Sequence, residues 1–209
     1  MTTRNFITII FLLAYITPFL FIANNNPSLT FYDLAEWTTL LPGERSSFPP
    51  LTIAFALRLN ILLLVLYLAS VYHPTLLLHK VVLYGAIVSL VIAQLPPLEI
   101  LQTLQDTNYQ QQLLFAIVST AILLLKIQLP RLFNDYEKFV CLFIAFLGTT
   151  ALLFAWQHTS KSFSDYKLVA QPAIALGLFF LTYSLCFVYG IKQKRDAMAS
   201  RLILQKSET

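Results

Sequence analysis

Six long apolar runs, separated by short polar gaps, occupy most of this chain. Each run is close to the roughly 20 residues that an α-helix needs to cross the hydrocarbon core of a bilayer. The runs are Phe6–Ala23, Leu51–Tyr72, Pro74–Ala93, Leu113–Leu129, Phe139–Trp156 and Pro172–Ile191. The sequence therefore predicts an all-α integral membrane protein, in which a bundle of six transmembrane helices forms a single domain over residues 1–209.

The low charge content of the chain supports this class of fold. Charged residues make up only 11% of the sequence, whereas a soluble domain usually carries about 25%. The longest polar stretch, Asn24–Pro50, is too short to bury a core of its own. The net charge of +4 could indicate nucleic-acid binding, but Lys and Arg gather at the ends of the apolar runs, as they do in oriented membrane proteins. We therefore expect the lipid bilayer as the surroundings and no nucleic-acid partner.

The distribution of Lys and Arg also predicts the orientation. If the N-terminus is cytoplasmic, ten of the 14 basic residues lie on the inner side, three lie outside, and Arg58 falls within a run. Basic residues accumulate on the cytoplasmic side of membrane proteins. We therefore expect a multi-pass protein of the plasma or inner membrane with both termini cytoplasmic, and residues 192–209 as a basic cytoplasmic tail. The alternative is a cleaved signal peptide that leaves five spans, but Phe21 stands where such a site needs a small residue.

Prolines predict where several helices begin or end. Pro18 should kink the first helix or unwind its outer end, because proline lacks a backbone N–H and clashes with the preceding turn. Pro50 should open the second helix. The pair His73 and Pro74 predicts a tight inner turn, with Pro74 at the first position of the third helix. Residues 130–138 are expected to form a short inner loop.

Two short helices are expected to lie on the outer surface of the membrane. Thr30 stands three residues before Asp33, a spacing typical of a helix start. A surface helix over Thr30–Leu41 would place its apolar side on the lipid. After Pro97, the residues Leu98, Leu101 and Leu104 recur at a spacing of three. This spacing predicts the second interfacial helix.

Arg58 is the polar residue with the strongest implication, because it falls within the second run. An arginine inside the membrane costs at least about 2.5 kcal/mol, so its side chain must reach the interface or find a partner. Asn60 lies two residues further on, and we treat the two as a candidate polar intramembrane site. One interpretation is a cation that binds a substrate or a partner. The other is an arginine that reaches the headgroups or pairs with an outer-loop carboxylate; the candidates are Asp33, Glu36 and Glu44.

Small residues recur every four positions in several runs. Such stripes allow helix backbones in membranes to approach closely. The residues that we expect to pack helices in this way are Gly85, Ser89, Ala93, Ala173 and Gly177. Packing within the bundle is one interpretation, and a docking face for a partner's helices is the other.

The remaining reactive residues carry little chemistry in this arrangement. Cys141 and Cys186 are expected to be buried free thiols, since their spacing fits neither a metal site nor a redox motif. His79 could ligate a pigment or a metal, but a second buried histidine is missing from the expected bundle. Lys80 would reach the inner headgroups. No acidic residue falls within a run, although coupled transport usually needs one.

We therefore expect no catalytic residue, no cofactor and no bound metal. The leading hypothesis is a non-catalytic subunit or scaffold of a membrane complex, with a membrane-protein partner or a second copy of the chain. One alternative is a small permease or channel component for a neutral or lipid-like solute. It would need a cavity lined by polar groups drawn from Asn60, Arg58, Ser119, Thr149, Thr150 and Thr182. A weaker alternative is a lipid-modifying enzyme in which Arg58 holds a phosphate.

Overall fold

A computed structural model gives the fold of the chain and describes residues 2–22, 28–30, 50–95, 107–162, 168–169 and 173–207. Each apolar run overlaps one of its helices. They are α1 (Thr3–Ile16), α3 (Pro50–Val71), α4 (Leu77–Ile92), α5 (Thr107–Gln128), α6 (Pro130–Ser162) and α7 (Ala173–Ser207). The mainly helical fold expected from the sequence is confirmed.

Three helices are long and apolar enough to cross a membrane, within the part of the chain that the structure describes. They lie at Gln110–Gln128, Tyr136–Gln157 and Ile174–Ser200. The other apolar helical segments are shorter: α1 has 14 residues, α4 has 16, and the segment of α3 whose side chains are described is Phe55–Val71.

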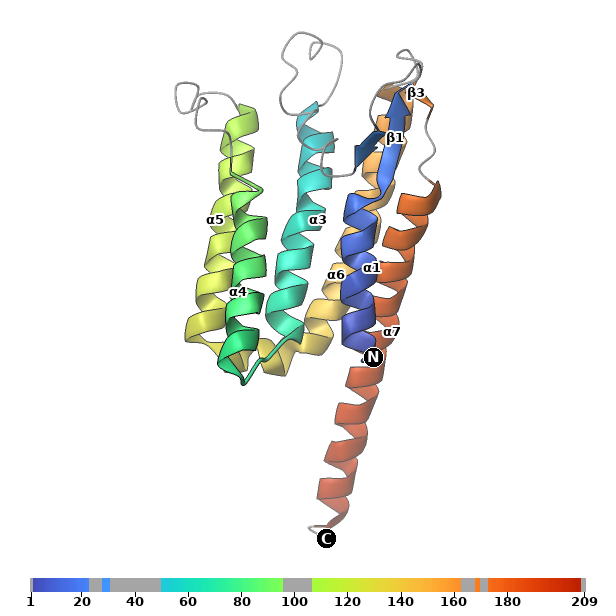
Figure 1. The fold of residues 1–209 in the computed structure, drawn as a ribbon. Coiled ribbons are helices and arrows are strands. Elements are labelled where there is room, and N and C mark those ends of the chain that lie inside the picture. The colour runs from blue at the N-terminus through green and yellow to red at the C-terminus, as the bar shows by residue number, and fades with distance from the viewer. Residues whose placement is uncertain are drawn as a thin grey trace.

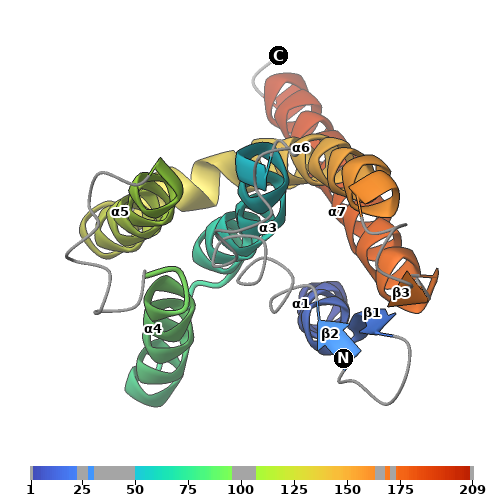
Figure 2. The same ribbon diagram turned by 90° about the horizontal axis from the view of Figure 1, so that it is seen from above.

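The helices form an open arc rather than a closed ring (Figure 2). Helix α3 packs mainly on α6 and α5, α6 packs on α7, and α7 packs on α1. Helix α4 contacts α5 and α3, so the order along the arc is α4, α5, α3, α6, α7 and α1. Figure 1 shows that the N-terminus and the link between α3 and α4 lie at one end of the helices. We call this the basic end, because Arg4, Lys80 and Lys126 lie there. We call the opposite end the sheet end.

A small sheet stands at the sheet end (Figure 1). Strand β1 (Pro18–Ile22) is central and pairs antiparallel with both β2 (Ser28–Thr30) and β3 (Leu168–Val169). Phe21 pairs with Ser28 on one side and with Val169 on the other. The sheet was not expected from the sequence. It connects the chain after α1 to the segment before α7.

The first helix is shorter than its apolar run. Helix α1 ends at Ile16, and Pro18 begins β1. Thr17 closes the helix, because its backbone N–H and its hydroxyl both donate to the Leu13 carbonyl, at 2.9 and 2.6 Å. The helix ends at Ile16, two residues before the proline, which cannot continue it because it lacks a backbone N–H. Of the two effects predicted for Pro18, the loss of helix at the outer end is the one observed. The expected continuation of the helix is wrong over Pro18–Ile22, because this segment forms β1, and Ala23 lies outside the described residues.

Three other local predictions differ from the structure. Thr30 is the last residue of β2 and does not begin a helix; the rest of the expected surface helix, and the second one at residues 98–104, lie outside the described residues. Helix α4 begins at Leu77 and not at Pro74. The expected inner loop at 130–138 is helical, because Pro130 takes the first position of α6, where its missing N–H costs nothing. The first turns of α6 therefore cross the basic end (Figures 1 and 2).

The core of the arc is centred on α3. From Ala56 to Val71 this helix is buried on nearly every side. Four aromatic rings meet beside it: Phe11 makes edge contacts with Phe179 and Tyr183, and it also lies 6.4 Å from the ring of Tyr67. Burying such rings contributes much of the packing energy between helices.

Candidate functional site

A cluster of charged and hydroxyl groups joins α1, α6 and α7 at the basic end. The Arg4 guanidinium lies 3.2 Å from the Glu137 carboxylate and donates to the Tyr189 hydroxyl at 2.7 Å. Tyr189 in turn donates to the other Glu137 oxygen at 2.8 Å, and Gln193 donates to Tyr189. Arg4 also donates to the Val71 carbonyl at the end of α3. We call these five residues the Arg4 cluster.

Hydroxyl groups extend the cluster towards α3. The Tyr72 hydroxyl donates to Asn5 Oδ1 at 3.0 Å and lies 2.7 Å from the Thr8 hydroxyl. Tyr67 donates to the backbone carbonyl of Arg4. Charge-assisted and neutral hydrogen bonds thus hold the start of α1 against the end of α3 and the middle of α7.

His73 and Lys126 form a second polar contact at the same end. Lys126 Nζ lies 2.6 Å from His73 Nδ1, and the ammonium also stands 5.7 Å from the centre of the Phe133 ring. Burial lowers the pKa of His73 to about 4, and the positive charges of Lys126 and Arg4 act in the same direction. A neutral imidazole can accept the hydrogen bond that the ammonium donates.

This contact predicts a pH-dependent stability. The ordinary pKa of histidine is 6.5, whereas that of His73 in the folded chain is about 4. The unfolded chain therefore binds a proton first as the pH falls, so the contribution of His73 is fully present above about pH 6.5 and is lost between about pH 6.5 and 4. The apparent melting temperature in detergent should fall across this window, and it should fall less in His73→Gln. An equal fall in both proteins would contradict the assignment.

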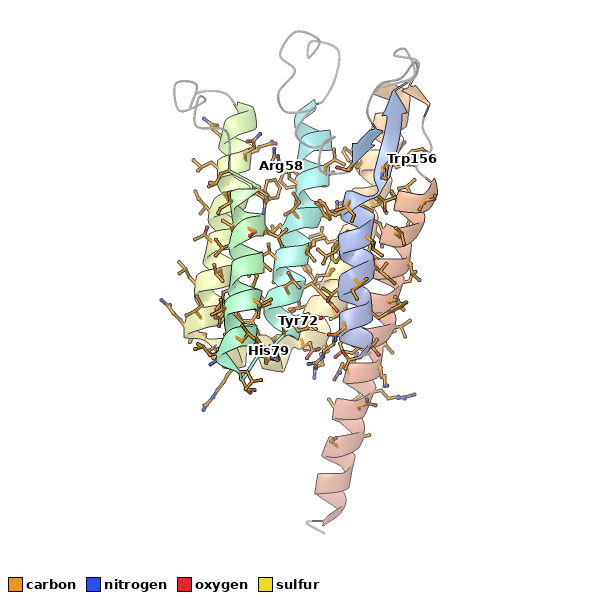
Figure 3. The ribbon with its side chains drawn as sticks, viewed as in Figure 1. Arg58, Tyr72, His79 and Trp156 are labelled. Carbon is orange, nitrogen blue, oxygen red and sulfur yellow. The ribbon has the colours of Figure 1, made fainter. Side chains whose placement is uncertain are left out.

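A cavity opens beside the Arg4 cluster, between α1, the end of α3 and α4. Its volume is about 760 Å³. Polar side chains line its basic end, and the remainder is lined by apolar side chains and Ser89. The lining includes Thr2, Arg4, Asn5, Thr8, Leu12, Leu68, Tyr72, His73, His79, Val82, Leu83, Ala86, Ser89 and Leu90. Figure 3 shows Tyr72 and His79 near each other at the basic end, far from Arg58.

Arg58 is fully inside the helix arc, with 1% of its surface exposed. The carboxylates expected to pair with it, Asp33, Glu36 and Glu44, lie outside the described residues. Asn60 is also buried, but it belongs to another contact: its amide donates to the Ala56 carbonyl at 2.7 Å, and its carbonyl accepts from Tyr183. The structure therefore buries both members of the candidate intramembrane site and ties Asn60 to α7.

A buried amide joins the segment after α4 to α5. Gln94 donates to the Ser119 hydroxyl at 2.7 Å, and both side chains are fully buried. Gln112 is buried on the same helix as Ser119. The polar residues that the permease hypothesis would place around one cavity are instead spread over several contacts: Thr182 bonds to the Leu178 carbonyl and Thr150 to the Phe146 carbonyl.

The small residues expected to pack helices lie mostly on the outside. Gly85, Ser89 and Gly177 are exposed, and a Cβ atom added at Gly85 or Gly177 would meet no atom within 4 Å. Ala93 is half-buried, and no side-chain environment is described for Ala173. Close approach within the chain occurs at other glycines. The role of these small residues in helix packing stays a prediction.

The structure shows where the histidine and the cysteines singled out in the sequence lie. His79 and Lys80 lie in the first turn of α4 and are exposed, and His79 lines the cavity. Cys141 and Cys186 are buried free thiols, as predicted. Within the described ranges, no three His, Cys, Asp or Glu side chains gather as a metal site requires.

Glu137 is the residue of the site that the sequence interpretation missed. It stands within residues 130–138, which the sequence predicts to be a loop between two runs. The available signal was Pro130: a helix that begins there places Glu137 two turns inside it and close to the apolar run. Its partner Arg4 stands just before the first run, on the side where the sequence also places residues 130–138, so the two opposite charges could have been paired.

The chain was compared with known proteins. No protein-family model, no curated protein and no solved structure matches it.

Proposed function

We propose that this chain is a six-span membrane protein with both termini on the cytoplasmic side. The six helices that overlap the apolar runs support this proposal, and three of them meet the length and composition of a span. The N-terminus and the long extension of α7 lie at one end of the helices (Figure 1), as an even number of crossings requires. Basic residues concentrate at this end, which favours its placement in the cytoplasm. The described ones are Arg4, Lys80, Lys126, Arg131, Lys138, Lys192, Lys194 and Arg195.

Within the membrane, the proposed role is that of a non-catalytic subunit or scaffold that binds another membrane protein or a second copy. The observation that carries this role is the outer face of α4. Only Leu83 and Ile87 of this helix are buried. Its other face combines exposed large apolar side chains with Gly85 and Ser89, four residues apart. Small residues at this spacing let a neighbouring helix approach closely in lipid.

A Gly85→Leu substitution should separate assembly from folding. A side chain at position 85 meets no atom of the described chain within 4 Å, so the protein should remain folded. A partner helix seated on the Gly85–Ser89 face would be held away by the bulk of leucine. Native mass spectrometry of gently extracted protein should then show loss of a stoichiometric protein partner that the unaltered chain retains.

The matched control is Val88→Leu, which changes another exposed position of the same helix without filling the small-residue face. This variant should retain the partner. If Gly85→Leu keeps its partner, or if the unaltered chain is recovered only as a monomer from its own membrane, the subunit role is wrong.

A second candidate function is the handling of a lipid-like solute. It is supported by the cavity between α1 and α4, which combines a polar end with an apolar wall. The residues first expected to line such a cavity lie elsewhere, so this candidate depends on Arg4, His79 and the wall of α4 instead. Transport of a solute by the reconstituted protein would favour it over a purely structural role.

A further inference from the structure

The cavity between α1 and α4 lies where the helix arc is open. Helices α1 and α4 are the two ends of the arc, and they face each other without close packing (Figure 2). The end of α3 and the link that follows it form the back wall, with Leu68 and Val71. In a membrane, such an opening faces the lipid and must be filled by something apolar.

The two ends of the cavity differ in chemistry. Arg4, Asn5 and Thr8 of α1 and His79 of α4 lie at the basic end. Further along α4, the lining continues through Val82 and the following turns to Leu90. From His79 to Leu90 the helix rises about 16 Å, which is close to the roughly 15 Å of hydrocarbon in one leaflet. The cavity thus has the polarity and the depth of one lipid leaflet.

The polar end favours a negative charge. Helix α1 begins at Thr3 and helix α4 begins at Leu77, so the positive ends of both helix dipoles lie at this end of the cavity. Neither helix carries an acidic residue in its first turn that would offset this positive potential. The side chain of Arg4 is 37% exposed and uses three of its five N–H groups in the Arg4 cluster. Glu137, which partly neutralises Arg4, does not line the cavity.

The size of the cavity selects a lipid over a protein helix. Its volume of about 760 Å³ lies within the range of about 300–1,000 Å³ of small-molecule sites. A spanning helix about 10 Å wide and 30 Å long would fill about 2,400 Å³. The cavity therefore suits a headgroup with part of its acyl chains.

From these observations we infer that the cavity binds an anionic phospholipid, with its phosphate at the Arg4 and His79 end and its acyl chains along α4. The phosphate oxygens accept hydrogen bonds from the Arg4 guanidinium and the His79 imidazole. The apolar chains lie against Leu83, Ala86 and Leu90. This site rests on the proposed membrane location. It shares Ser89 with the face proposed for a partner helix, whereas Gly85 does not line the cavity.

The test uses the full chain in a neutral detergent. Phosphatidylglycerol, or phosphatidylcholine with the same acyl chains, is added, and native mass spectrometry counts the lipids that remain bound. We expect one phosphatidylglycerol per chain and about tenfold weaker retention of phosphatidylcholine, because only the former has a net negative headgroup. Equal retention of the two lipids would overturn the proposal.

Two substitutions on α4 test the apolar wall. Ala86→Phe fills the cavity and should abolish phosphatidylglycerol retention, whereas Val88→Phe, at an exposed position outside the lining, should retain it. Continued protection of Cys141 and Cys186 from a thiol reagent shows that each variant remains folded. Normal lipid retention by folded Ala86→Phe would overturn the site.

A second pair tests the polar end without touching the core. His79→Ala should weaken phosphatidylglycerol retention about tenfold, as expected for one hydrogen bond to a charged group. Lys80→Ala removes the neighbouring exposed charge, which does not line the cavity, and should have little effect. Equal losses in the two variants would indicate general surface charge and overturn the headgroup assignment. Gly85→Leu should retain the lipid while losing a partner, so the two proposals fail separately.

Discussion

A Gly148→Ala substitution is expected to destabilise the protein by about 3 kcal/mol, although it adds one methyl group. A Cβ atom at position 148 would stand 2.8 Å from Cδ1 of Tyr183 and closer still to Cε1 and Cζ. The tyrosine cannot move aside cheaply, because its side chain is 1% exposed and its hydroxyl donates to Asn60. Its ring also stacks on Phe179 and meets Phe11 edge-on. One methyl group would therefore disturb the contacts between four helices.

The matched control is Gly177→Ala, in helix α7. Position 177 is exposed and has nothing within 4 Å of an added Cβ, so alanine should be neutral or stabilise the helix by up to about 1 kcal/mol. Cys141 and Cys186 provide the measurement, since both are buried free thiols that a fluorescent thiol reagent labels only on unfolding. Similar melting temperatures for the two variants would show that α6 and α7 are not packed as described.

The contrast between these glycines shows what the sequence can and cannot predict. The stripes of small residues spaced by four include Gly85 and Gly177, and both are exposed. Gly148 and Gly190 were not singled out by this spacing, although they lie against Tyr183 and Leu142. In a soluble helix the polar face reveals which side is buried. In lipid the outside is as apolar as the inside, so hydropathy carries no information about which face turns inward.

The positions of the helices were easier to predict than their packing. Apolar runs and prolines act locally, so Pro18 and Pro50 mark real boundaries. The sheet formed by β1, β2 and β3 could not be predicted in this way, because it joins segments separated by more than 130 residues. The same applies to the contact between Arg4 and Glu137, which are 133 positions apart.

This ion pair gives the second large expected effect. Replacing Glu137 with leucine should destabilise the protein by about 2–3 kcal/mol, less than the roughly 3–5 kcal/mol of a fully buried pair because the Arg4 side chain is 37% exposed. The substitution leaves Arg4 without its counter-charge and removes the acceptor of the Tyr189 hydroxyl. It also removes a favourable electrostatic interaction with Lys126.

Two further variants separate charge from hydrogen bonding. Glu137→Gln keeps an oxygen that can accept from Tyr189, so it should be less destabilising than leucine. Asp196→Asn is the control for loss of a carboxylate, because Asp196 and its neighbour Arg195 form an exposed pair at 3.9 Å; such pairs contribute about 0–1 kcal/mol. A Glu137→Leu protein as stable as Asp196→Asn would show that the Arg4 cluster does not hold the helices together.

The double variant Arg4→Leu with Glu137→Leu decides how the pair acts. If the loss in the single variant comes from an uncompensated charge, removing Arg4 as well should restore part of the stability, because an apolar pair can replace a buried ion pair at little cost. If Arg4 instead acts mainly through Tyr189 and the Val71 carbonyl, the two losses should add. Additive losses would assign the cluster to hydrogen bonding between α1, α3 and α7, and recovery would assign it to the ion pair between α1 and α6.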